Sequence, residues 1–150
     1  MTVDCSSERP VWLVIGLVVF GLILAIAIPN IKLGRMTANE AAARQSLRAI
    51  NLAEAKFAKS DTAGGYACSL QRLSESHLIE DSLANGKNRG FLFDISDCGS
   101  KPPYKTYHAF ATPLMKNQTG YWVFCSDQTG QVKGSPTSRG DCSAELMGQR

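Results

Sequence analysis

The sequence predicts an α+β fold in which one long N-terminal helix packs against a small antiparallel sheet of about three strands. Three features support this prediction: an apolar run near the N-terminus, an amphipathic helical stretch after it, and three later runs rich in aromatic and β-branched residues. A helix stripe and one face of a sheet can bury each other, which gives a two-layer unit.

The chain of 150 residues divides into five segments. About 120 residues follow the first thirty, enough for one small domain in which cross-links would add stability. We expect a cytoplasmic N-terminal segment (1–10), a transmembrane helix (11–28), its amphipathic continuation (29–60), a connector with the sheet (61–134), and a C-terminal tail tied by a disulfide (135–150).

The run from Val11 to Ile28 contains no charged and no strongly polar side chain. As a helix it would be about 27 Å long, close to the hydrocarbon thickness of a bilayer. The alternatives are a buried core helix, which rarely lacks polar residues over such a length, and a cleaved signal peptide. A signal peptide would carry basic residues where this chain has Asp4 and Glu8. The run therefore predicts a single membrane span, with the lipid bilayer as a partner.

Two signals disagree about the orientation of this span. Lys32 and Arg35 follow it, and the positive-inside rule would place them in the cytoplasm. Four cysteines also follow it, and an even set in a small domain indicates two bridges formed in an oxidising compartment. We give the cysteines more weight and expect the N-terminus in the cytoplasm and the domain outside.

The four domain cysteines allow three pairings, between which the sequence does not choose. We expect Cys68 to pair with Cys98 and Cys125 with Cys142, since the second bridge would staple the polar tail to the last strand. This closure would contribute about 3 kcal/mol in the chain-entropy model. Cys5 is left over on the cytoplasmic side, as a free thiol or, alternatively, as a lipidated one.

The helix is expected to be kinked or weak where Pro29 and Gly34 follow the apolar run. Thr37 and Glu40 then fit a capping box that would restart the helix. The alternative is a continuous helix with Thr37 inside it. Glu40 also stands four residues before Arg44, a spacing that predicts a helical ion pair.

Beyond this point apolar residues recur at helical spacing on one face, which should pack against something apolar. We expect this helix to end near Lys59 and one or two short helices to follow, within 68–76 and 77–84, before the turn at Asn85-Gly86. Strand-like runs cover 90–95, 104–111 and 120–125, and their spacing suits an antiparallel meander. The apolar face consists of Ala43, Leu47, Ile50, Ala53 and Phe57.

The apolar run ends in the segment Ala25, Ile26, Ala27, Ile28, Pro29 and Asn30. This segment resembles the anchor motif of the type IV pilin and type II secretion pseudopilin family. Gly21 lies at the spacing before Pro29 that the family shows, and the segments 78–86, 90–93, 111–113 and 127–132 are similar to segments of bacterial pseudopilins. The resemblance covers most of the chain.

The resemblance implies a pilin-like fold, in which one helix is half membrane anchor and half spine of a small sheet. It also implies a structural subunit of a type IV pilus or type II secretion-type filament. Such a subunit is held in the bacterial inner membrane with its C-terminal domain periplasmic or extracellular. Self-association, or contact with other pilin-like subunits, would occur through the N-terminal helix.

The sequence differs from this family just before and at the start of the apolar run. Members are normally cut after a Gly and before a Phe, with a Glu a few residues later. Counted back from Pro29, the cut would fall between Ser7 and Glu8, and Trp12 takes the place of the glutamate. An alternative function is therefore an unprocessed single-pass membrane protein whose extracytoplasmic domain binds a partner or ligand without polymerising.

No motif for catalysis or cofactor binding accompanies His77 or His108, so we expect no enzymatic activity and no cofactor. The cysteine spacings do not fit a zinc site. We expect no metal, with one alternative: some related pseudopilins bind calcium in a late loop, which would correspond here to Asp127 and Asp141. The charge of +3 is spread without interleaved aromatic residues, and no nucleic acid partner is predicted.

Overall fold

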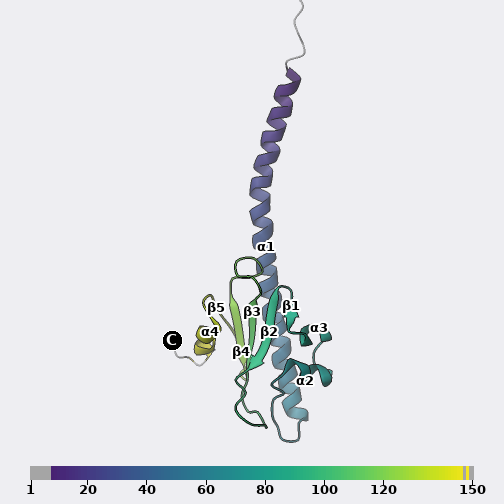
Figure 1. Ribbon diagram of the computed structural model, residues 1–150, viewed down its shortest axis with the longest axis vertical. Helices are drawn as coiled ribbons and strands as arrows, with labels where there is room; N and C mark the ends of the chain where they lie inside the picture. The colour runs from purple at the N-terminus through teal and green to yellow at the C-terminus, as the bar shows by residue number, and fades with distance from the viewer. Residues whose placement is uncertain (1–7, 147, 149–150) are drawn as a thin grey trace, which may run out of the picture. The chain divides into compact units, whose positions relative to one another are not determined.

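The computed structural model describes residues 8–146 and residue 148. The chain forms two compact units, Met1–Arg35 and Met36–Arg150. Helix α1, Glu8–Ser60, contributes to both (Figure 1). Its first part makes up the described portion of the first unit, where every described side chain from Val11 to Ile28 is exposed.

The second unit is built on a five-stranded antiparallel sheet in the order β1-β2-β3-β4-β5, so the predicted meander is confirmed and the predicted number of strands is wrong. The two extra strands lie at the edges, where one is only two residues long and the other contains a glycine. The strands are β1 (Lys87–Asn88), β2 (Phe91–Ser96), β3 (His108–Pro113), β4 (Val123–Asp127) and β5 (Val132–Ser135).

Strand β5 forms because the chain turns back tightly after β4. The Gly130 N–H donates to the Asp127 carbonyl over 2.9 Å, and the Asp127 carboxylate accepts from the Thr129 N–H and hydroxyl. Gly134 then lies against the ring of Phe124, where a β-carbon would come within 2.9 Å of that ring. The glycine that weakens β5 as a sequence signal is what allows its close approach.

The second half of α1 covers one face of the sheet, as the apolar stripe predicted. Ala43, Leu47, Ile50 and Ala53 are buried there, and Phe57 packs at the edge of the same core. The sheet contributes alternate residues of β2, β3 and β4 to this core, as expected for strands with one face toward a helix. These residues are Phe91, Phe93, Ala109, Ala111 and Phe124.

Two short helices follow α1, as expected: α2 (Leu70–Glu75) and α3 (Asp81–Ala84). Helix α2 buries Leu70 and Leu73 in the main core, and α3 buries Leu83 there. Figure 1 shows them on the β1 side of the sheet. They close the core where the short strand β1 leaves it uncovered.

The C-terminal tail contains a helix that the sequence analysis did not predict, α4 (Arg139–Leu146). Ser138 precedes it, accepts from the Asp141 N–H over 3.1 Å and donates to the Asp141 carboxylate over 2.9 Å. Cys142 and Leu146 pack with Phe110 and Cys125, whose side chains point away from α1. The domain therefore has part of a third layer where two layers were expected.

Helix α1 runs without interruption through Pro29, Gly34 and Thr37, so the predicted restart at Thr37 is wrong. Proline fixes φ at a value that a helix accepts, and one lost hydrogen bond does not end a helix of this length. Glu40 turns to the β3–β4 loop, and Arg44 lies over the ring of Phe124, 4.7 Å from its centre. In place of the predicted ion pair, Glu40 contacts the β3–β4 loop and Arg44 contacts the sheet.

Candidate membrane anchor and polar sites of the domain

One helix in the described part of the chain, α1, is long and apolar enough to cross a membrane, judged by its length and composition. Its most apolar window is fully exposed. This exposure contradicts the alternative of a core helix buried in a soluble domain. Exposure of the described apolar positions from Val11 to Ile28 to water would be strongly unfavourable, since each large side chain buried from water contributes about 1.5–3 kcal/mol.

The residues of the anchor motif all lie within α1. Gly21 is exposed, and Ala25, Ile26 and Ile28 have exposed side chains in a regular helix. A glycine at position 21 leaves a local gap in the side-chain surface, with nothing within 4 Å of where a β-carbon would stand. Glycines at such positions allow close approach of a neighbouring helix, and Gly16 and Gly34 of α1 are equally open.

Several predicted residues fall outside the described part of the chain. Cys5 and Ser7 precede it, and the side chain of Glu8 is not described. Of the anchor motif, the side chains of Ala27, Pro29 and Asn30 are likewise outside it. The cleavage site and the role of Cys5 therefore stay predictions from sequence.

The structure pairs the domain cysteines as Cys68 with Cys98 and Cys125 with Cys142, the two pairs that the sequence analysis favours. The Cα atoms are 6.0 Å and 5.9 Å apart. The first bridge joins the segment before α2 to the loop after β2. The second ties α4 to β4, so the tail is held against the sheet.

Asp127 and Asp141, the candidate calcium ligands, are used in separate local structures. Asp127 is buried and accepts from Thr129 over 2.6 Å and 2.9 Å, while Asp141 accepts from Ser138 at the start of α4. Within the residues that the structure describes, no group of three or more His, Cys, Asp or Glu side chains is placed to hold a metal ion.

The two histidines lie apart from any cluster of reactive groups. His77 is exposed after α2. His108 lies in β3 with its Nδ1 3.7 Å from the carboxylate of Asp97, a separation longer than a hydrogen bond. Neither arrangement places a nucleophile beside a base.

The domain contains a buried carboxylate, Glu54, that was not predicted from the sequence. Glu54 is on the apolar side of α1 and is completely buried. Its oxygens accept from the N–H groups of Ala67 over 2.7 Å and Cys68 over 3.1 Å. Burial raises the pKa of Glu54, while these two hydrogen bonds and the charge of Arg72 act in the opposite direction. Glu54 thus fixes the segment that carries the first disulfide.

A second polar contact lies on the same side of α1. The Tyr107 hydroxyl donates to the Asn51 side-chain oxygen over 3.1 Å, and the Asn51 amide donates to the Ser126 hydroxyl over 2.6 Å. Ser126 in turn donates to the Gln131 carbonyl in the β4–β5 turn over 2.6 Å. Every member of this chain of hydrogen bonds has a partner, which is the condition for burying such groups without a large penalty.

The start of the second unit holds the β3–β4 loop through two side chains of α1. The Asn39 amide donates to the Thr119 carbonyl over 3.1 Å. Glu40 accepts from the N–H groups of Tyr121 over 2.7 Å and Trp122 over 3.3 Å. These contacts fix the loop to residues 39–40 of the helix.

The burial of Glu54 could have been predicted from its spacing in the sequence. It lies four residues after Ile50 and three before Phe57, so it falls on the apolar stripe itself. Asn51 lies four residues after Leu47 in the same way. Polar residues at such positions predict buried hydrogen-bonded groups, although their partners are distant in sequence and cannot be named from it.

Comparison of the chain with protein-family models, with curated proteins and with solved structures gave no match.

Proposed function

We propose that this chain is a membrane-anchored, pilin-like structural subunit that assembles through its N-terminal helix into a type IV pilus or type II secretion-type filament. The observation that carries the proposal is the two-part character of α1. The described side chains from Val11 to Ile28 are all exposed and lack any charge, and the second part of α1 buries an apolar stripe under a sheet. The absence of a motif for catalysis in the sequence agrees with a structural, non-enzymatic role.

The environment of the domain is inferred from its cysteines. Two bridges in one small domain form and persist in an oxidising compartment. A single bacterial inner-membrane span with its N-terminus in the cytoplasm would place them there. Labelling of the four cysteines in intact cells only after permeabilisation, and without prior reduction, would place the domain inside and contradict this topology.

Self-association can be tested within the span. A photo-crosslinking phenylalanine analogue at Phe20 should give a ladder of homo-oligomers longer than dimers, because each helix would have more than one neighbour. The same analogue at Leu52, exposed on the domain half of α1, is the matched control. If neither position gives crosslinked oligomers at native expression level, assembly through the helix is refuted.

The second candidate function is that of an unprocessed single-pass protein whose outer domain binds a partner. It is favoured by Ser7, Glu8 and Trp12, which stand at the positions where the family has its cleavage and assembly residues. Mass spectrometry of the mature N-terminus separates the two. A chain that begins at Glu8 supports processing by a prepilin-type peptidase. A chain that begins at Met1 or Thr2 contradicts it and leaves the second candidate.

A further inference from the structure

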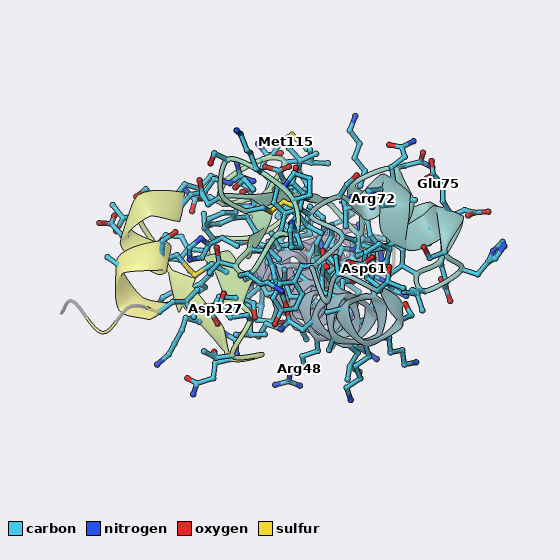
Figure 2. All side chains as sticks on the ribbon, turned by 90° about the horizontal axis from the view of Figure 1, so that it is seen from below. Arg48, Asp61, Arg72, Glu75, Met115 and Asp127 are labelled. Atoms are coloured by element: carbon cyan, nitrogen blue, oxygen red, sulfur yellow. A yellow bond between two sulfur atoms is a disulfide. The ribbon has the colours of Figure 1, made fainter. Side chains whose placement is uncertain are left out.

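The loop between β3 and β4, residues 114–122, exposes four large apolar side chains. Leu114 is 49 % exposed, Met115 52 %, Tyr121 43 % and Trp122 36 %. We call these four side chains the loop patch. Met115 lies at the outer edge of the domain in Figure 2, and Tyr121 and Trp122 contact each other edge to face, with ring centres 5.9 Å apart.

The loop is closed by its own hydrogen bonds. The Thr119 hydroxyl accepts from the Met115 N–H and donates to the Met115 carbonyl, each over 3.1 Å. The Asn117 N–H donates to the Gly120 carbonyl over 2.9 Å. Together with the bonds from Asn39 and Glu40 to its backbone, these bonds hold the loop patch outward. The apolar side chains cannot turn into the core without breaking them.

The position of the loop in the chain limits what can cover it. It is bonded to residues 39–40 of α1, and only eleven residues separate Asn39 from Ile28, the end of the apolar run. Eleven residues of helix are about 17 Å long, and even a fully extended chain of that length reaches only about 40 Å. If the run spans a bilayer, the loop patch is tethered close to that bilayer.

The chemistry of the loop matches the headgroup region of a bilayer. Tryptophan and tyrosine favour this region because their rings are apolar with one polar group. The loop contains no acidic residue and one cation, Lys116, whose ammonium lies 5.4 Å from the centre of the Tyr121 ring. A lysine can lay its stem on apolar surface while its ammonium meets lipid phosphates.

We propose that the loop patch inserts into the headgroup region of the bilayer that anchors α1, with Lys116 facing anionic lipid. The inference rests on the proposed membrane anchor. Such a contact gives the domain a defined orientation at the membrane, because the helix and the loop attach it at two points.

Tryptophan quenching by brominated lipid tests this contact, since the chain has only two tryptophans, Trp12 and Trp122. The full-length Trp12→Phe variant, reconstituted in vesicles of phosphatidylcholine and phosphatidylglycerol, reports on Trp122 alone. A matched control adds Trp122→Phe and Leu52→Trp, which moves the reporter to an exposed position farther along α1. Brominated lipid should quench the reporter at 122 about twofold or more above the control, as expected for an interfacial aromatic.

Two further variants complete the test. Leu114→Ser with Met115→Ser should reduce quenching of Trp122, and unchanged circular dichroism would show that the fold is retained. The Trp122→Phe variant reports on Trp12 in the span. Quenching at 12 but not at 122 refutes the loop contact and leaves the anchor intact, whereas no quenching at 12 refutes the anchor as well. A third outcome would be that brominated lipid does not quench Trp122, while its protection from quenching by acrylamide increases with the density of protein in the vesicles. That outcome indicates a protein partner and overturns the proposal.

Discussion

Glu54 provides the sharpest test of how the domain is held together. It is completely buried and bonded to two backbone N–H groups, of Ala67 and Cys68, the first of which is itself buried. In Glu54→Gln the side-chain amide keeps one accepting oxygen and turns an NH2 group toward the second N–H. One hydrogen bond is lost and a buried N–H is left unpaired, which should lower the free energy of unfolding by about 1–3 kcal/mol.

Denaturant unfolding of the detergent-solubilised chain, followed by Trp122 fluorescence in a Trp12→Phe background, measures this change. Glu75→Gln is the matched control, since Glu75 is an exposed carboxylate at the end of α2. It should change the free energy of unfolding by no more than a few tenths of a kcal/mol. Equal stability of the two variants would refute the role assigned to Glu54.

The same residue predicts how stability depends on pH. Burial raises the pKa of Glu54 above its usual value of 4.5, so between 4.5 and the raised pKa the folded protein keeps a proton that the unfolded chain releases. The contribution of Glu54 is therefore fully present below 4.5 and is lost as the pH rises through the folded-state pKa. The stability difference between the parent and Glu54→Gln should fall with rising pH over this interval. A difference that grows instead would show that the hydrogen bonds outweigh burial.

Two further predictions concern the core and the tail. Leu47→Ala should cost about 2–5 kcal/mol in unfolding free energy because Leu47 is completely buried, whereas Leu52→Ala, on the exposed side of the same helix, should cost little. Cys125→Ser with Cys142→Ser should remove about 3 kcal/mol by the chain-entropy model and free α4 to exchange its amide protons, and Cys5→Ser should do neither. An unchanged exchange rate in α4 would contradict the second prediction.

The parts of the fold that the sequence predicted are those with a local physical signal. The stripe from Ala43 to Phe57 keeps helical spacing over fifteen residues, and the central strands carry aromatic residues on alternating faces. The parts that it did not predict depend on contacts made elsewhere in the chain. Strand β5 has little intrinsic preference for extended structure and is held by the turn after Asp127. Helix α4 is short and polar, and it is held by Ser138 and the bridge to Cys142.

The candidate sites likewise divide into those with a local signal in the sequence and those that depend on distant contacts. The run from Val11 to Ile28 was predicted as one apolar helix because its signal is composition and length, which need no partner elsewhere in the chain. Thr37 and Glu40 fit a capping box by spacing, but the helix had no end there for them to cap. Glu40 instead accepts hydrogen bonds from the N–H groups of Tyr121 and Trp122, about eighty residues away. No rule based on local spacing could have predicted these partners.

The polar groups on the stripe explain how a helix with a simple apolar face is placed uniquely on its sheet. Alanine and leucine at helical spacing would pack almost as well after a shift of one turn, about 5.4 Å along the axis. Glu54 can reach the N–H groups of Ala67 and Cys68, and Asn51 can reach Ser126, in only one of these positions. A shift would leave a buried carboxylate and a buried amide unpaired, which is far more costly than lost apolar contact. The hydrophobic stripe thus drives the packing of α1, and these two side chains select its register.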